Sequence, residues 1–302
     1  MVPKSLFGFD VVSVIGPGAG CTIYAVTDPA GQLFALKHVV RKSDDDDKFL
    51  QQLQNEYDSS RLFRHPALRK VIEMKTPKKF FSNKVNEMGL VLEWVDGTPL
   101  DQHVPADLNA LLGIFAHSAG ALASMHRLRM VHCDFKPHNV LICDDAKVKV
   151  IDFGQACKIG TGKQRLQGTP DYVAPEQVKF LPLDARTDVY SLGASLYWCL
   201  TGQKVPTYYN ADKHKREAVK LQKFPSPIDL KPEIPQAISE LAMQCVRYNP
   251  DQRPADMVEV LTVLEASLRA TAAPAQPPAP AASEEDLHPA RPKPRVVKDW
   301  GI

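Results

Sequence analysis

The sequence lacks a hydrophobic run long enough to cross a membrane. Its longest mostly apolar stretch, Val189 to Leu200, contains serines and a glycine, and it falls short of the roughly 20 residues that a membrane-spanning helix needs. The N-terminal residues, MVPKSLFGFD, also lack the apolar core and the small-residue cleavage site of a secretory signal. We therefore expect no membrane span and a cytoplasmic location.

Paired cysteines and an excess of one charge are missing as well. The six cysteines contain no CxxC pair and no zinc-like spacing, which argues against a disulfide framework and against a structural zinc site. Lys and Arg total 37 and Asp and Glu total 35, so the formal charge is +2. Because proteins that bind nucleic acids or membrane surfaces carry a large basic excess, we expect no nucleic-acid partner.

Hydrophobic periodicity divides the 302 residues into a strand-rich first part and a helical second part. Strands are predicted at 9–15, 22–26, 33–40, 71–75, 88–95, 140–142 and 148–151. Helices are predicted at 46–63, 108–126, 185–201, 212–222, 236–247 and 255–268. The remainder, 269–302, is rich in Pro and Ala and poor in apolar anchors, which predicts a disordered tail.

Two features of the strand-rich part are suited to contact phosphate. The glycine turn GPGAG at 16–20 lies between the first two strands, where glycines let backbone N–H groups approach phosphate oxygens; a plain hairpin turn explains the same residues. Lys37 lies inside the third strand and needs an acidic partner to fix its side chain. Glu56 on the following helix is the natural candidate, with Asn55 and Asp58 as alternatives.

The segment Val131 to Ile142, VHCDFKPHNVLI, carries the densest set of reactive side chains. Asp134 can accept a hydroxyl proton, Lys136 can neutralise charge on a transferring phosphoryl group, and Asn139 can hold Mg²⁺ through oxygen. Asp152, at the start of a DFG sequence directly after a predicted strand, supplies a second oxygen ligand. A polar loop between a helix and a strand would not require these residue types in this order.

Taken in order, these motifs resemble those of the eukaryotic-like Ser/Thr protein kinases. The resemblance covers Phe9 to Leu268 and includes the glycine turn, AxK, HxDxKxxN, DFG, APE and the DVxSxG helix. It implies an α+β, bilobal protein kinase fold, with a small antiparallel β-sheet lobe carrying one helix (9–95) and a larger, mostly helical lobe (96–268). Arg253 is expected to pair with Glu176 of the APE sequence. The Ala/Pro-rich tail suggests a bacterial member.

The resemblance also implies ATP and Mg²⁺ as cofactors, and Ser/Thr hydroxyls of proteins as substrates. Asp134, Lys136, Asn139 and Asp152 would be catalytic, and of these Asn139 and Asp152 would bind the metal. Lys136 two residues after Asp134, together with Thr169 before a proline, matches the Ser/Thr pattern rather than the tyrosine pattern.

The nucleotide-binding residues that the resemblance implies come from both parts of the chain. They are Ile15, Gly16, Gly18, Gly20, Cys21, Ile23, Ala35, Lys37, Glu56, Leu92, Glu93, Val95 and Leu141. In the family pattern, Lys37 contacts the α- and β-phosphates and pairs with Glu56. Residues 93–95 form the hinge that hydrogen-bonds adenine, and Leu92 is the gatekeeper beside the pocket.

Two cysteines stand where the family pattern has other residues. Cys21 replaces the third glycine of the loop, which we expect still to cover phosphate. Cys133 replaces the arginine that clamps a phosphorylated activation loop in many regulated kinases through charge-assisted hydrogen bonds. The loop itself, 155–173, contains only Thr161, Thr169 and Tyr172 as hydroxyl acceptors. We hypothesise that activity does not depend on phosphorylation of this loop.

Two other functions fit parts of the pattern. A catalytically weak pseudokinase acting as an ATP-binding scaffold would share the fold, but the intact Lys37, Asp134, Asn139 and Asp152 argue against it. A small-molecule kinase would share HxDxxxxN, but such relatives usually lack Lys136 and the APE segment. In the tail, PPAP at 277–280 and RPKPR at 291–295 would suit a proline-motif or docking partner, although a disordered linker explains them more simply.

Overall fold

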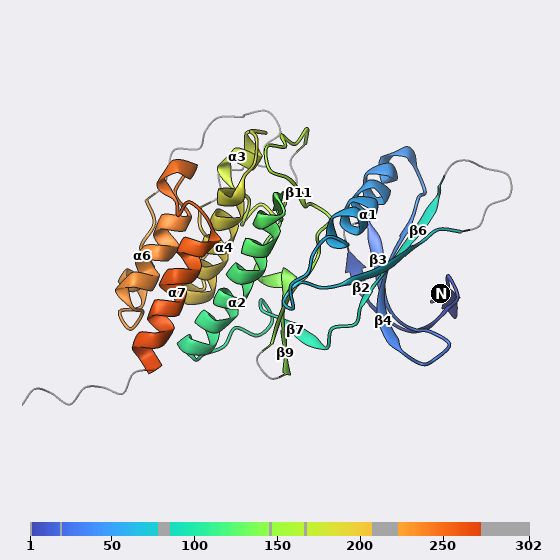
Figure 1. The fold of residues 1–302 in the computed structure, drawn as a ribbon, viewed down its shortest axis with the longest axis horizontal. Helices are drawn as coiled ribbons and strands as arrows, with labels where there is room; N and C mark the ends of the chain where they lie inside the picture. Colours follow the sequence, from blue (N-terminus) through green and yellow to red (C-terminus); the bar gives the residue numbers. More distant parts are fainter. Residues whose placement is uncertain are drawn as a thin grey trace, which may run out of the picture.

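The computed structural model describes residues 2–18, 20–77, 85–144, 147–165, 168–206 and 223–272. These residues form a small lobe built around a β-sheet and a larger, mostly helical lobe, and the two lobes lie side by side along the longest axis of the molecule (Figure 1). The two-lobed α+β architecture predicted from the sequence is confirmed.

A six-stranded sheet forms the small lobe, with the strand order β1-β2-β3-β4-β6-β5 and antiparallel pairing throughout. Its strands are β1 (Ser5–Leu6), β2 (Phe9–Gly18), β3 (Cys21–Thr27), β4 (Leu33–Val40), β5 (Val71–Lys75) and β6 (Glu87–Glu93). The bounds predicted for β4 and β5 are confirmed. β2 extends past the predicted Ile15, because the glycines of the turn continue the ladder, with Gly16 opposite Ile23 and Gly18 opposite Cys21.

Helix α1 (Asp47–Ser60), which follows a single 3-10 turn, η1 (Asp44–Asp46), packs against one face of this sheet. Strand side chains alternate between the two faces of a sheet. In β4 this alternation places Lys37 on the same face as Ala35 and Val39, which form a buried apolar cluster with Leu50 and Leu53 of α1. The fold therefore encloses the Lys37 ammonium between the sheet and the helix.

The sequence predicted that this helix would run to Phe63, but α1 ends at Ser60. Phe63 belongs to the apolar core of the large lobe. Its ring lies edge-on to that of Phe153, with 5.1 Å between the ring centroids. Phe63 thus packs with the large lobe, three residues after the end of α1.

The large lobe consists of helices around a main apolar core, with short strands on the side that faces the small lobe (Figure 1). Its helices are α2 (Leu108–Arg127), α3 (Pro175–Val178), α4 (Ala185–Thr201), α5 (Pro227–Leu230), α6 (Gln236–Cys245) and α7 (Met257–Ala272), with 3-10 turns η2 (Pro137–Asn139) and η4 (Pro250–Gln252). Its strands are β7 (Gly97–Pro99), β8 (Met130–Val131), β9 (Val140–Cys143), β10 (Val148–Val150) and β11 (Cys157–Lys158). The helix predicted over 185–201 is confirmed as α4. The helix predicted over 212–222 lies outside the described residues, as does the chain beyond Ala272.

Helices α2 and α7 lie side by side in the large lobe (Figure 1). α7 continues through Ala272, past the predicted boundary at Leu268, and the hydroxyl of Thr271 in its last turn donates to Asn109 Oδ1 of α2 at 2.7 Å. α2 is long and apolar enough to qualify as a membrane span by length and composition alone, so the statement from the sequence that Val189 to Leu200 is the longest mostly apolar stretch is wrong. More than half of the apolar stretch of α2 is buried inside the protein, as in a core helix.

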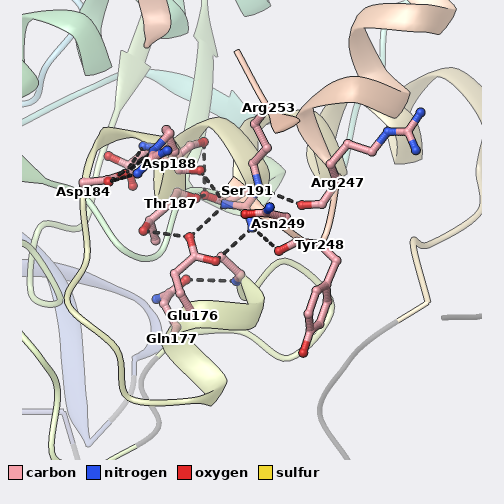
Figure 2. A network of polar contacts seen from close by, with 12 residues as sticks. Glu176, Gln177, Asp184, Thr187, Asp188, Ser191, Arg247, Tyr248, Asn249 and Arg253 are labelled. Carbon is pink, nitrogen blue, oxygen red and sulfur yellow. Dashed lines mark hydrogen bonds and ion pairs between the residues drawn. The ribbon is translucent and has the colours of Figure 1, made fainter. Parts of the chain in front are cut away.

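The start of α3 is fixed to the C-terminal helices by a buried ion pair between Glu176 and Arg253 (Figure 2). Both terminal nitrogens of the guanidinium take part: Nη1 donates to Oε1 at 2.8 Å, and Nη2 donates to Oε2 at 2.9 Å. The Glu176 carboxylate accepts a third hydrogen bond, which the hydroxyl of Thr187 donates to Oε1. The predicted pairing of Arg253 with Glu176 is confirmed, and it links the APE segment to α4 and η4.

We predict that Glu176→Ala strongly destabilises the fold. The substitution leaves the guanidinium of Arg253 buried without its carboxylate, and breaking a buried ion pair in this way costs about 3–5 kcal/mol. Urea unfolding should show a loss of this size in the free energy of unfolding. Glu233→Ala, which removes an exposed carboxylate, is the matched control, and an equal midpoint for both variants would contradict the prediction.

Candidate active site

A cavity of about 310 Å³ opens where residues of both lobes meet. All four predicted catalytic residues and several of the predicted nucleotide-binding residues line it. They are Gly18, Cys21, Ile23, Lys37, Glu56, Asp134, Lys136, Asn139 and Asp152. The fold therefore brings side chains that are more than a hundred residues apart in the sequence to one site.

The remaining predicted nucleotide-binding residues do not line this cavity. Some of them are buried parts of the scaffold: Ala35 and Leu92 face each other across β4 and β6, and Leu141 is buried in β9. The others are Ile15, Gly16, Gly20, Glu93 and Val95, of which Ile15 is half exposed. Binding roles for all the predicted nucleotide-binding residues, inside and outside the cavity lining, stay predictions.

The glycine turn lies over one end of the cavity and packs on α1. Gly20 has a positive φ of 70°, a conformation that favours glycine. A methyl group at this position would overlap the ring of Phe49 on α1, which itself lines the cavity. The sequence analysis missed Phe49, because nothing in a helical pattern marks which apolar residue a distant turn will touch.

Lys37 forms two short ion pairs with carboxylates from different parts of the chain. Its ammonium donates to Glu56 Oε2 at 2.7 Å and to Asp152 Oδ1 at 2.9 Å. Glu56 is therefore the acidic partner among the candidates on the helix. Asn55 instead donates to the carbonyl oxygens of Gly154 and Ala156, so neighbouring residues of α1 hold both Lys37 and the DFG segment.

Burial and these ion pairs shift the pKa of each of the three charged groups in opposite directions. Burial disfavours the Lys37 ammonium, but Asp152 and Glu56 outweigh it and raise the lysine pKa. Burial also raises the pKa of Glu56, and Lys37 only partly opposes this. For Asp152 the balance is reversed, because Lys37 outweighs burial and holds the pKa well below its usual range. Asp152 is thus an anion at any physiological pH.

Asp134 and Lys136 meet Thr169 at the opposite end of the cavity. Asp134 Oδ1 accepts hydrogen bonds from the backbone N–H of Thr169 at 3.0 Å and from its hydroxyl at 3.1 Å. Lys136 Nζ donates to Asp134 Oδ2 at 3.2 Å and to the Thr169 hydroxyl oxygen at 2.6 Å. The sequence pointed to Thr169 for the class of kinase and as a loop hydroxyl, but not as a residue that contacts both candidate catalytic side chains.

Asn139 and Asp152 fit a site for a hard divalent cation. Both line the cavity. The amide nitrogen of Asn139 donates to the carbonyl of Asp134 at 2.9 Å, so the amide oxygen is the atom that could serve as a ligand. Lys37 contacts only Oδ1 of Asp152, so Oδ2 remains for a ligand. One carboxylate and one amide oxygen suit Mg²⁺, which keeps several waters and shares phosphate oxygens.

We call residues 132–139 the catalytic loop, because they carry Asp134, Lys136 and Asn139. Its backbone is held by Asp188, a fully buried residue near the start of α4. Its Oδ2 accepts from the backbone N–H of His132 and from His126 Nε2, both at 2.8 Å, and its Oδ1 accepts from the N–H of Cys133 at 2.9 Å. Burial alone would raise the pKa of Asp188, but these hydrogen bonds lower it. Asp188 thereby places Asp134 next to the cavity.

Arg69 is a further wall residue that the sequence analysis did not identify. It is only 8% exposed, and its Nε donates to the backbone carbonyl of Glu93 at 3.0 Å. Burial lowers its pKa, whereas the nearby Glu56, Asp152 and Glu93 carboxylates raise it. A second cation therefore balances the acidic pair beside Lys37. No motif or periodicity marked it, because Arg69 is one of several charged residues before β5, next to Lys70.

Comparison with known proteins agrees with this geometry. A family model described as the protein kinase domain matches residues 9–264. A probable serine/threonine-protein kinase of Clostridium acetobutylicum is 28% identical over 272 residues, which cover 85% of this chain and 39% of the relative. A probable serine/threonine-protein kinase of Streptomyces coelicolor is 30% identical over 288 residues, 88% of this chain and 41% of the relative. Serine/threonine-protein kinase PrkC of Bacillus subtilis is 26% identical over 265 residues, which cover 84% of this chain and 39% of the relative.

The chain thus spans about two fifths of the length of these relatives. The family match covers most of the chain, including every motif that the fold gathers around the cavity. The resemblance to eukaryotic-like Ser/Thr protein kinases seen in the sequence is therefore confirmed, and the relatives are bacterial. The chain belongs to the protein kinase family and is similar to its bacterial serine/threonine-protein kinases.

Proposed function

We propose that this chain transfers the γ-phosphate of ATP to Ser or Thr hydroxyls of protein substrates. The observation that carries the proposal is that Lys37, Asp134, Lys136, Asn139 and Asp152 line one cavity. Phosphoryl transfer needs little covalent chemistry from the protein, so positioning and charge stabilisation supply most of the catalysis. A pseudokinase would not need all five side chains, and the folded APE segment supports protein substrates over small molecules.

At the hydroxyl end of the cavity, Asp134 is the group that would orient the substrate and accept its proton. Lys136 lies beside it, where its ammonium can neutralise charge on the transferring phosphoryl group. Thr169 bridges the two through its hydroxyl. This bridge keeps the aspartate and the lysine at a set separation before a substrate arrives.

At the nucleotide end, Lys37 is the cation that would contact the α- and β-phosphates, with its direction fixed by Glu56. Asn139 and Asp152 would hold Mg²⁺, which would neutralise the phosphate oxygens as charge develops. Asp152 would serve both groups, since its Oδ1 holds Lys37 and its Oδ2 would be available to the metal.

We predict that Asp134→Asn lowers phosphate transfer by about 10²–10⁴-fold, the usual contribution of a positioned general base. The assay uses purified protein, radiolabelled ATP and a generic basic protein substrate. Asp45→Asn, at an exposed position before α1, is the control and should retain full activity. Equal transfer by Asp134→Asn and wild type would refute the proposed catalysis.

Lys37→Met should weaken binding of ATP in the presence of Mg²⁺ by roughly 10- to 150-fold. This range corresponds to the 1.5–3 kcal/mol of one hydrogen bond to a charged group. Isothermal titration calorimetry measures the affinity directly. Lys70→Met removes an exposed lysine from the same lobe and should bind as wild type; a similar loss in both variants would contradict the role of Lys37.

We further propose that activity is independent of phosphorylation of the activation loop. Cys133, which replaces the clamping arginine, is buried and directs its thiol at Cys157 rather than at solvent. Of the hydroxyls in the loop, that of Thr169 already bonds Asp134 and Lys136. The nearby cation Lys163 donates to the carbonyl of Gln155 within the same loop. Lys163 is thus engaged within the loop, and a phosphate on Thr161 would lack the arginine that Cys133 replaces.

Thr161→Ala accordingly should retain most of the wild-type phosphate-transfer rate, since Thr161 has no partner in the cavity. The measurement is the initial rate with protein that has been treated with a phosphatase, so that both proteins start unphosphorylated. A variant that loses most of its activity, or a wild type that phosphatase inactivates, would contradict independence from loop phosphorylation.

A cytoplasmic location remains part of this proposal and is supported by the cysteine pattern. All six cysteines are free thiols in the structure, as expected in a reducing compartment. The proline motifs of the tail lie outside the described residues, so a docking partner there stays a prediction from the sequence.

A further inference from the structure

Two cysteine thiols meet beneath the candidate active site. Cys133, directly before Asp134, and Cys157, in β11 just after the DFG segment, place their sulfur atoms 3.4 Å apart. Strand β11 pairs antiparallel with β8, which brings the catalytic loop and the start of the activation loop together at this point. Neither the phosphate transfer proposed above nor the metal site uses these thiols.

The two thiols have different surroundings, which suggests different chemical roles. Cys133 is 2% exposed, whereas Cys157 is only partly buried. The hydrogen bond between the two thiols, helped by Lys163 and the Thr161 hydroxyl, lowers the pKa of Cys157 against the effect of burial. The same contact and burial raise the pKa of Cys133. Because the thiolate is the reactive form, Cys157 is the thiol that an oxidant reaches first.

We propose that Cys133 and Cys157 form an oxidative modification site, at which a peroxide converts the two thiols to a disulfide. The Cys157 thiolate attacks one peroxide oxygen; an S–O bond forms, the O–O bond breaks and hydroxide leaves to become water. The sulfur of Cys133 then attacks the resulting sulfenic acid; the S–S bond forms, the S–O bond breaks and a second water leaves with the proton of Cys133. Two thiols lose two electrons in total, and hydrogen peroxide gains them.

Closing the disulfide requires only a small movement. A disulfide bond measures about 2.05 Å, so the sulfur atoms must approach by about 1.4 Å. The backbone of Cys133 is fixed, because its N–H donates to Asp188 at 2.9 Å and its carbonyl accepts from Gln177 at 2.8 Å. Cys157 belongs to a strand of only two residues. The movement therefore falls on β11 rather than on the catalytic loop.

The disulfide would act as a covalent anchor for the activation loop. The sulfur atoms are already in contact while Lys37 bonds both Glu56 and Asp152, so the bond would hold the arrangement in which the site is assembled. Its covalent loop would enclose the segment that contains Asp134 and Asp152. An oxidant would thereby supply the tether that an arginine and a phosphate provide in regulated relatives of this family.

The site is tested by peptide mapping of the purified full chain. Reduced protein is exposed to hydrogen peroxide, quenched with catalase, alkylated and digested without reductant. We expect a peptide that links Cys133 to Cys157, lighter by two hydrogens than the separate thiol peptides and lost on reduction. Cys143→Ser, which removes a half-buried thiol outside the cavity, should still form it. Oxidation of other cysteines without this linked peptide would overturn the proposal.

Single substitutions test the order of the two steps. In Cys133→Ser, Cys157 should stop at the sulfenic acid, which dimedone traps as a stable adduct detected by mass spectrometry. In Cys157→Ser, Cys133 should remain a thiol, since it is buried and its thiolate is disfavoured. A dimedone adduct on Cys133 and none on Cys157 would reverse the assignment and overturn it.

The anchoring role has its own measurement, which does not require kinase activity. Hydrogen–deuterium exchange of peptides covering residues 155–165 should slow by roughly tenfold on oxidation, because fewer opened states remain accessible. Peroxide-treated Cys133→Ser should show no slowing. Faster exchange in the oxidised wild type, with the linked peptide present, would overturn the anchoring role.

Discussion

The buried ammonium of Lys37 is the constraint on which the rest of the site depends. A charge enclosed between a sheet and a helix is unfavourable unless it is paired and hydrogen-bonded. Its two partners come from α1 and from the segment after β10, so neutralising one lysine requires the sheet, the helix and the large lobe to be in register. Arg69 completes the balance, with two cations beside two carboxylates. The same contact that stabilises the interior thus positions the groups proposed to bind phosphate and metal.

A second set of polar contacts, from Asp188 of α4 and from Thr169, holds the catalytic loop. Asp188 fixes the backbone before Asp134, and Thr169 bonds the carboxylate of Asp134 itself. From there the chain continues to Glu176, whose pairing with Arg253 ties the end of the activation loop to the C-terminal helices. The proposed catalytic groups are therefore supported by several elements of the large lobe, and each support is a charged or polar group that could not be buried alone.

The sequence predicted the parts of this arrangement that depend on local patterns. The strand position of Lys37 and the acidic residues of the following helix made Glu56 its natural partner, and ordered motifs identified Asp134, Asn139 and Asp152. The choice of Glu56 over Asp58 needed the structure, in which Asp58 accepts from Gln54 at the exposed surface. Arg69, Phe49 and the contact between Cys133 and Cys157 were not predicted, because each joins segments that no periodicity or motif spacing relates. Short strands such as β11 have too few residues to show a period at all.

The central claim, transfer of the terminal phosphate of ATP to a hydroxyl, is tested most directly by the position of the label. Wild-type protein is incubated in parallel with ATP labelled at the γ-phosphate and ATP labelled at the α-phosphate, each with Mg²⁺ and several basic protein substrates. The account predicts that only the γ-label reaches the substrates and that acid hydrolysis recovers it as phosphoserine or phosphothreonine. Label from the α-phosphate, which would indicate nucleotidyl transfer, or no label with any substrate, would contradict it.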